Sequence, residues 1–225
     1  MNRPVKRGWA GVCLVLLGCG AMAWVELWLR PAYPVKSALK AVIFLGCIWL
    51  YALGGRNREL LDVFRLRPRS ALKRGWLLAC GVFFLLLGGY ALLSPWLDLS
   101  AIPANLAAKE GLTAATFPLA ALYITLFNSL LEELFFRGFA FLTLRKSGHE
   151  RFAWGFSAGA FALYHVCIMD GWFHPFFFLL FTAGLTLGGL LFNALDRDGS
   201  IWPSWLVHMG ANLATNLIGL SLFVL

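Results

Sequence analysis

Two adjacent glutamates stand inside an apolar stretch of the sequence, where an ionised side chain is costly. Glu132 and Glu133 lie within residues 127–136, and Arg137 follows Glu133 by four residues. In a helix, Glu133 and Arg137 at this spacing can form an ion pair. Glu132 points about 100° away from Glu133 and shares its face with Asn128. Because one carboxylate neutralises one arginine, Glu132 needs another explanation.

Two histidines and an amide stand in later apolar stretches. His165 follows Phe161 by four residues, and His208 precedes Asn212 by the same spacing. On a helix, His208 and Asn212 therefore share one face. Ionisable residues in three separate apolar segments are most simply explained if they converge on one polar cavity.

This set of side chains suits the hydrolysis of an amide bond. The reaction needs a base that takes a proton from water, donors for the developing oxyanion, and an acid for the leaving amine. Because a low dielectric disfavours a charged carboxylate, we expect Glu132 to exchange a proton near neutral pH, as such a base must. His208 and Asn212 can each donate a hydrogen bond from one face. The site is complete for hydrolysis without a serine or cysteine nucleophile.

The elements that position these residues are predicted to be membrane-spanning helices. Of the 225 residues, 60% are hydrophobic and only 13% are charged, whereas a soluble domain is about half apolar and about a quarter charged. Each apolar block approaches the roughly 20 residues that a span needs. The predicted spans lie near 9–29, 36–54, 76–97, 117–143, 152–169, 174–194 and 201–223. We therefore predict an all-α, polytopic transmembrane helical bundle of about seven spans that forms one domain over residues 1–225.

The basic residues predict the orientation of the bundle rather than nucleic-acid binding. The net charge is +8, but Lys and Arg gather at the ends of apolar blocks. The connector after the second span carries Arg56, Arg58, Arg65, Arg67, Arg69, Lys73 and Arg74. The positive-inside rule places this connector and the N-terminus in the cytoplasm. We expect the first span to be a retained helix, although its sequence near Cys19 also resembles a cleaved leader.

Two local features complete this picture. The sequence from Asp196 to Gly199 predicts an ordinary cytoplasmic turn. The predicted boundaries place His208 about two turns from the cytoplasmic end of its span and Glu132 about four turns from Arg145. One shared site therefore requires either that the helices are staggered or that the predicted boundaries are wrong.

Three motifs in fixed order connect the sequence to a known family. The motifs are Glu132-Glu133-x-x-x-Arg137, Phe161-x-x-x-His165 and His208-x-x-x-Asn212. Together on successive predicted spans they are a strong signal, and they resemble the CPBP family, which comprises the CAAX prenyl endopeptidases and the Abi-type, or glutamic-type, intramembrane proteases. The resemblance covers about residues 117–222 and leaves the first three spans, 9–97, unassigned.

The resemblance implies a role for each catalytic residue. Glu132 would be the general base, and His165 would help to hold the water. His208 and Asn212 would polarise the scissile carbonyl. The residues expected to have structural roles at the site are Glu133, Arg137, Asn128 and Phe161.

A metal ion is the open alternative to a base acting alone. If zinc is bound, its ligands would be Glu132, His165 and His208. The sequence lacks the H-E-x-x-H pattern, in which one helix presents both histidines to the metal. We therefore favour a mechanism without a cofactor.

The sequence thus predicts an intramembrane endopeptidase that hydrolyses peptide bonds of membrane-associated or lipidated substrates through a glutamate-activated water. Its partners would be membrane lipid and a peptide or membrane-anchored protein, with no nucleic acid. The resemblance implies a bacterial inner (plasma) membrane. Two alternatives stay open: a proton-coupled transporter, which would also bury Glu and His, and a non-catalytic family member in immunity or membrane organisation.

Overall fold

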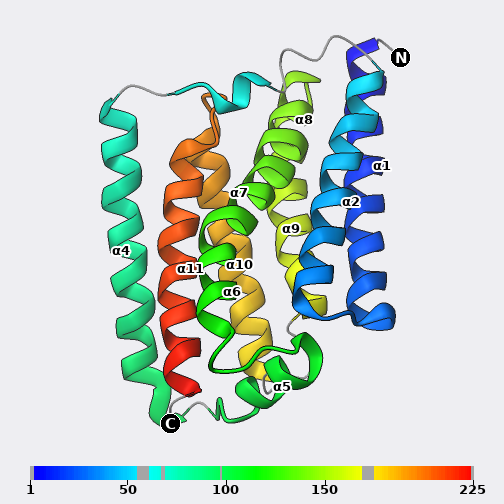
Figure 1. Ribbon diagram of the computed structural model, residues 1–225. Coiled ribbons are helices and arrows are strands. Elements are labelled where there is room, and N and C mark those ends of the chain that lie inside the picture. The colour runs from blue at the N-terminus through cyan, green and yellow to red at the C-terminus, as the bar shows by residue number, and fades with distance from the viewer. Residues whose placement is uncertain (1–2, 55–60, 67–68, 97, 169–174, 224–225) are drawn as a thin grey trace.

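The computed structural model describes residues 3–54, 61–66, 69–96, 98–168 and 175–223, and within them the chain is helical with no strand (Figure 1). The helices are α1 (Arg3–Trp24), α2 (Tyr33–Leu53), α4 (Arg69–Leu93), α5 (Ala101–Glu110), α6 (Phe117–Tyr123), α7 (Ser129–Glu132), α8 (Leu142–Lys146), α9 (Glu150–Ile168), α10 (Pro175–Asp196) and α11 (Trp202–Leu222). The wider π-helical segments are η1 (Val25–Leu29), η4 (Ile124–Asn128) and η5 (Glu133–Phe141), and the 3₁₀ segments are η2 (Asp62–Phe64) and η3 (Ser94–Trp96). The predicted all-α polytopic bundle is confirmed.

Five helices of the described chain are long and apolar enough to cross a membrane. They are Arg7–Leu29, Tyr33–Leu53, Arg69–Trp96, Phe117–Lys146 and Phe178–Asp196. The two other predicted spans coincide with α9 and α11, which lie within the same bundle (Figure 1). These two helices carry the polar side chains of His165, His208 and Asn212.

The bundle is apolar outside and charged inside, the reverse of a soluble domain. Large side chains such as Leu17, Trp28 and Phe84 are exposed on its surface, as lipid contact requires. Buried aromatic residues form the centre, where the ring of Phe44 on α2 stacks on that of Phe135 at 3.8 Å. The chain is therefore an integral membrane protein whose polar residues are enclosed by its own helices.

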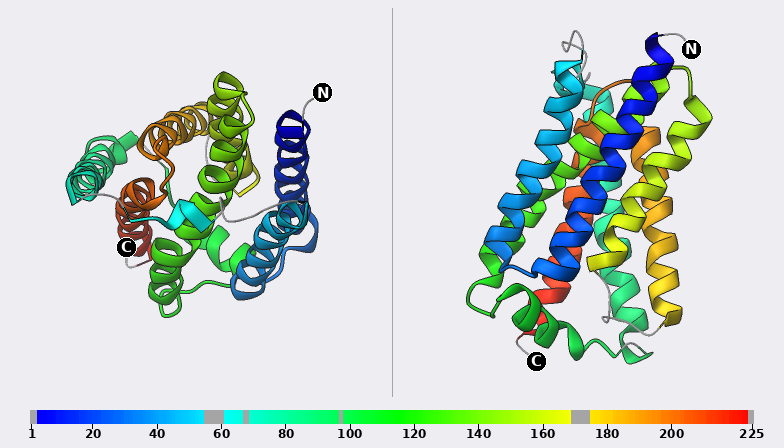
Figure 2. Two further views of the ribbon diagram at one scale, coloured as in Figure 1. Left: turned by 90° about the horizontal axis from the view of Figure 1, so that it is seen from above. Right: turned by 90° about the vertical axis from the view of Figure 1, so that its right-hand side faces the viewer.

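One long helix through the middle of the bundle carries both glutamates. It runs continuously from α6 through η4, α7 and η5 to α8, obliquely between the α1–α2 pair and the α4–α11 pair (Figures 1 and 2). Two π-helical segments flank α7, and such segments are frequent at functional sites. Other helices donate hydrogen bonds to their carbonyls, as Trp205 Nε1 does to Leu126 O at 3.1 Å and Ser157 Oγ to Phe136 O at 2.7 Å.

Close packing sets the depth of α11. A Cβ atom on Gly138 of η5 would lie 3.7 Å from Ile201, the residue before α11. The first turn of α11 therefore lies level with Gly138, deeper in the bundle than Lys146 at the end of α8. The helices are therefore staggered, as a shared site requires. On the other side of α11, a Cβ atom on Gly210 would lie 2.6 Å from the backbone oxygen of Ala79, so only glycine allows α4 to approach.

The chain turns between α10 and α11 as predicted, with Arg197 and Asp198 exposed, but Asp196 at its start is not an ordinary turn residue. Asp196 is fully buried and accepts hydrogen bonds from the backbone nitrogen of Ser204 at 3.2 Å and from its hydroxyl at 2.5 Å. Gly199, with φ of +93°, allows the tight reversal. The carboxylate is buried because it satisfies a free N–H group in the first turn of α11.

Candidate active site

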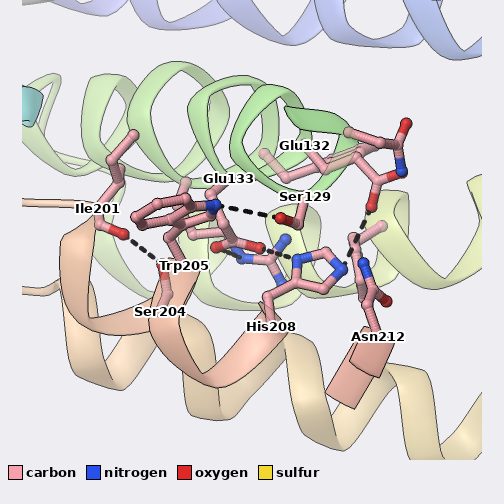
Figure 3. Close-up of polar contacts among 12 residues, drawn as sticks. Ser129, Glu132, Glu133, Ile201, Ser204, Trp205, His208 and Asn212 are labelled. Atoms are coloured by element: carbon pink, nitrogen blue, oxygen red, sulfur yellow. Dashed lines mark hydrogen bonds and ion pairs between the residues drawn. The ribbon is translucent and has the colours of Figure 1, made fainter. Parts of the chain in front are cut away.

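The structure brings the predicted base and both histidines together. Glu132, at the end of α7, is 2% exposed, and its Oε2 atom lies 3.7 Å from His165 Nε2 and 3.6 Å from His208 Nε2. Figure 3 shows His208 pointing from α11 towards Glu132. The other carboxylate oxygen, Oε1, accepts a hydrogen bond from Asn128 Nδ2 at 3.0 Å, as their spacing on one helix face predicted. Three helices thus meet at one carboxylate.

The sequence interpretation missed a fourth contributor, Lys40 of α2. Its ammonium forms an ion pair with Glu132 Oε1 and donates a hydrogen bond to Asn128 Oδ1 at 2.7 Å. We expected Glu132 to exchange a proton near neutral pH because burial alone disfavours its charged form. The ion pair with Lys40 opposes this effect of burial, because it favours the charged carboxylate. The available signal was a lysine inside the apolar span 36–54, where a charge needs a partner.

The predicted ion pair between Glu133 and Arg137 is confirmed. Both side chains are fully buried, and Arg137 Nε lies 3.4 Å from Glu133 Oε2. The guanidinium makes no hydrogen bond from Nε or its terminal nitrogens within the described residues, but it lies over the rings of Phe161 at 4.2 Å and Phe192 at 4.8 Å. The face of Phe161 therefore supports the arginine through cation–π contact.

Glu133 has a second partner that the sequence did not predict. Its Oε1 atom accepts a hydrogen bond from His208 Nδ1 at 2.7 Å (Figure 3). In α9, His165 Nδ1 likewise donates to the backbone oxygen of Phe161 at 2.8 Å. Because each Nδ1 carries a hydrogen in these bonds, each ring presents Nε2 to Glu132. The separations of 3.6 and 3.7 Å exceed a hydrogen bond, so neither Nε2 atom bonds to Oε2 directly.

Asn212 lies beside His208 on the same side of α11, as its spacing predicted (Figure 3). Its Nδ2 atom donates a hydrogen bond at 3.1 Å to the backbone oxygen of Ile124 in η4. An amide nitrogen carries two hydrogens. One hydrogen therefore fixes the side chain on the central helix, and the second can serve a substrate.

The ligands that zinc would need, if it binds, are Glu132, His165 and His208. Within the described residues, no group of three or more His, Cys, Asp and Glu side chains is placed to hold a metal ion. The ammonium of Lys40 also contacts Glu132 directly, and a divalent cation beside it would be repelled.

A bundle of apolar helices around a buried glutamate, two histidines and an amide defines an integral membrane protein with an internal polar site. Residues 114–214 match the family model described as type II CAAX prenyl endopeptidase Rce1-like. This match confirms the family resemblance that the three motifs predicted. The matched segment contains every residue of the three motifs. Lys40 lies outside it. No curated protein and no solved structure matches the chain significantly.

Proposed function

We propose that this protein is an intramembrane endopeptidase in which Glu132 activates a water molecule for attack on a peptide bond. One observation carries the proposal: Glu132 Oε2 makes no direct hydrogen bond among the described residues and faces the Nε2 atoms of two histidines. All three side chains lie inside an apolar bundle that also carries the endopeptidase family match.

The first step would be proton transfer from water to Glu132 Oε2, with His165 Nε2 holding the water from the other side. The resulting hydroxide would attack the carbonyl carbon of the peptide bond, and the carbonyl oxygen would become an oxyanion. The second amide hydrogen of Asn212 can donate to that oxyanion. His208 can do so when doubly protonated, since it lies between the carboxylates of Glu132 and Glu133.

The second step would return the proton. The Glu132 carboxyl would donate it to the nitrogen of the leaving amine as the C–N bond breaks, which yields a carboxylic acid and an amine and restores the Glu132 carboxylate. Glu133 would keep a hydrogen on His208 Nδ1 in both the neutral and the doubly protonated ring, because its Oε1 accepts that hydrogen.

The substrate would be a membrane-associated or lipidated peptide. The family description names a prenyl endopeptidase, and the exposed apolar surface of the bundle suits a substrate that arrives from the lipid phase. The side chain of His165 is 20% exposed, which offers a route into the otherwise buried centre. The N-terminus would be cytoplasmic, because α1 begins, α8 ends and α4 begins at the same end of the bundle (Figure 1), where these helix ends carry the basic residues Arg7, Lys146 and Arg69.

The test is cleavage of a prenylated peptide with a C-terminal Cys-aliphatic-aliphatic-X sequence, carrying a quenched fluorophore pair, in vesicles that contain the purified protein. We expect Glu132→Gln to lower the rate by about 10²–10⁴-fold, the usual contribution of a general base. Glu150→Gln is the control, because that carboxylate is exposed and pairs with Arg145. Equal rates for Glu132→Gln and the wild type would refute the proposal.

A further inference from the structure

We infer that Lys40 is a positioning residue of the catalytic centre, which holds Glu132 so that only Oε2 remains free for the water. The inference rests on the proposed function. It extends the active centre to α2, which lies outside the family match at residues 114–214.

Both donors near the Glu132 carboxylate contact the same oxygen. Lys40 Nζ and Asn128 Nδ2 each bond to Oε1, and Lys40 Nζ also donates to Asn128 Oδ1 at 2.7 Å. The three side chains therefore form a closed triangle of hydrogen bonds. A carboxylate held in this way cannot exchange its two oxygens by rotation without breaking two charge-assisted or polar contacts. Oε2 is thereby kept towards the histidines.

The lysine itself is held in place by aromatic rings. Lys40 is 5% exposed, and its ammonium lies 4.9 Å from the ring centre of Tyr164 and 5.6 Å from that of Phe44. Phe44 is in turn stacked on Phe135 of η5. Because the stem is enclosed by this core, the ammonium cannot extend to the membrane surface as exposed lysines do. Its position is set by the fold and not by solvent.

Lys40 also provides charge that the two histidines do not supply permanently. The groups that face Glu132 from other helices are Lys40 on α2, His165 on α9 and His208 on α11. The histidines are cationic only when doubly protonated. The lysine ammonium therefore offsets the cost of a buried carboxylate and keeps Glu132 able to accept a proton from water.

Lys36 is a matched control on the same helix. It lies one turn before Lys40, is similarly buried at 9% exposed, and pairs with Glu26 at 2.8 Å and Glu110 at 2.6 Å. Among the described contacts it does not reach Glu132. Lys36→Met and Lys40→Met therefore remove the same group from the same helix, but only the second alters the catalytic carboxylate.

The experiment compares these variants of the whole chain, with the quenched prenylated peptide as substrate. The kcat and KM values are measured across pH, and kcat is normalised to the amount of folded protein. For Lys40→Met we expect kcat at neutral pH to fall about tenfold or more, part of the 10²–10⁴-fold effect of the base, with KM nearly unchanged. The acidic limb of the kcat profile should move to higher pH, because a buried carboxylate without a cation gains a proton more readily. Lys40→Arg should restore the profile, and Lys36→Met should leave it unmoved.

A wild-type kcat and pH profile for Lys40→Met would overturn the inference. If Lys40→Met does not fold, Lys40→Gln replaces it, because glutamine keeps a donor but removes the charge. If the acidic limb of the kcat profile of Lys40→Gln moves to higher pH, the role of Lys40 is supported. If the limb does not move, the inference is overturned. The proposed function fails separately, if the wild type and Glu132→Gln cleave the peptide at the same rate.

Discussion

Glu132 and Glu133 are neighbours in the chain and equally buried, but their carboxylates have different surroundings. Glu133 Oε1 accepts a hydrogen bond from His208 Nδ1, and Oε2 lies 3.4 Å from the Arg137 guanidinium without a hydrogen bond among the described residues. Glu132 has only Oε1 engaged, by Lys40 and Asn128, while Oε2 faces two histidine nitrogens beyond hydrogen-bond distance. The two residues point to different sides of one helix, and each side meets a different set of helices.

This difference indicates what separates a reactive carboxylate from a structural one in a membrane. Burial and charge are common to both, so neither property distinguishes them. The distinguishing property is what the second oxygen faces: two histidine nitrogens for Glu132 and a permanently charged guanidinium for Glu133. In the proposed mechanism, Glu133 acts indirectly, because it orients His208 and neutralises Arg137.

The largest effect on stability is expected on the Glu133 side. Arg137→Met leaves the Glu133 carboxylate without its buried cation, and breaking a buried ion pair costs about 3–5 kcal/mol. Thermal unfolding in detergent measures this loss. The double variant Arg137→Met with Glu133→Gln should recover part of it, because both charges are then gone. A double variant less stable than Arg137→Met would show that Glu133 is stabilised by other contacts.

A large effect on activity is expected on the Glu132 side, with little loss of stability. Asn212→Ala removes the amide that we assign to the oxyanion, and loss of one such donor typically costs 10²–10³-fold in kcat. The rate of peptide cleavage checks this value. Asn216→Ala is the control, since Asn216 also donates from α11 to the central helix, at Ala121 O, but one turn further from His208. Similar losses in both variants would indicate a packing role.

A smaller effect is expected from removal of metals. A metal bound by Glu132 would give Oε2 a direct partner and remove the contrast with Glu133. Prolonged treatment with a chelator should therefore leave the cleavage rate within about twofold of the untreated enzyme, and zinc should not raise it, since Lys40 already supplies the cation beside Glu132. Loss of activity that zinc restores would contradict the proposed mechanism.

The smallest effect is expected at Glu110, another buried carboxylate with an oxygen that has no hydrogen-bond partner among the described residues. Its Oε1 bonds to Lys36, and its Oε2 has no hydrogen-bond partner within the described residues. No histidine contact accompanies it there, so Glu110→Gln should leave the cleavage rate unchanged. An altered rate would show that the outer end of the bundle contributes to catalysis.

The same variant has a defined dependence of stability on pH. Burial raises the pKa of Glu110 above its ordinary 4.5, although Lys36 opposes the shift. A carboxyl whose pKa is raised on folding stabilises the fold below the unfolded pKa and loses that contribution as pH rises through the folded pKa. Glu110→Gln should therefore gain stability relative to the wild type as pH rises from 4.5. Melting temperatures of both proteins across this range measure the difference.

The part of the site that lies within one helix could be predicted from the sequence. The pairs Glu133–Arg137 and Asn128–Glu132 follow from a spacing of four residues, and the cost of burying charge indicated that His165 and His208 would meet Glu132. The pairing of Lys40 with Glu132 spans 92 positions, and that of Glu133 with His208 spans 75. Neither follows from periodicity, because each depends on which faces of separate helices pack together.

The same limit explains two features of the fold that were not predicted. A hydropathy pattern shows that a segment is helical, but it does not reveal a turn that is one residue wider, so η4 and η5 were not predicted. The sequence from Asp196 to Gly199 predicted the turn but not the burial of the Asp196 side chain. Its burial depends on Ser204, whose position is set by the packing of α11.

The π-helical segment η4 makes the chemistry sensitive to chain length in a particular way. A π turn is equivalent to one extra residue accommodated in an α-helix. Deleting one residue from Ile124–Asn128 would let this stretch relax to regular α-helical winding, with the membrane span still continuous. Because the wider turn absorbs the extra residue, the residues on either side of this deletion would keep nearly their original relative orientation. A deletion in the α-helical stretch Phe117–Tyr123 would instead rotate the two sides by about 100° relative to each other. Only the second protein could insert and persist in the bilayer while its proposed base faced a different neighbour, so helical continuity and catalytic phase are separable properties of this chain.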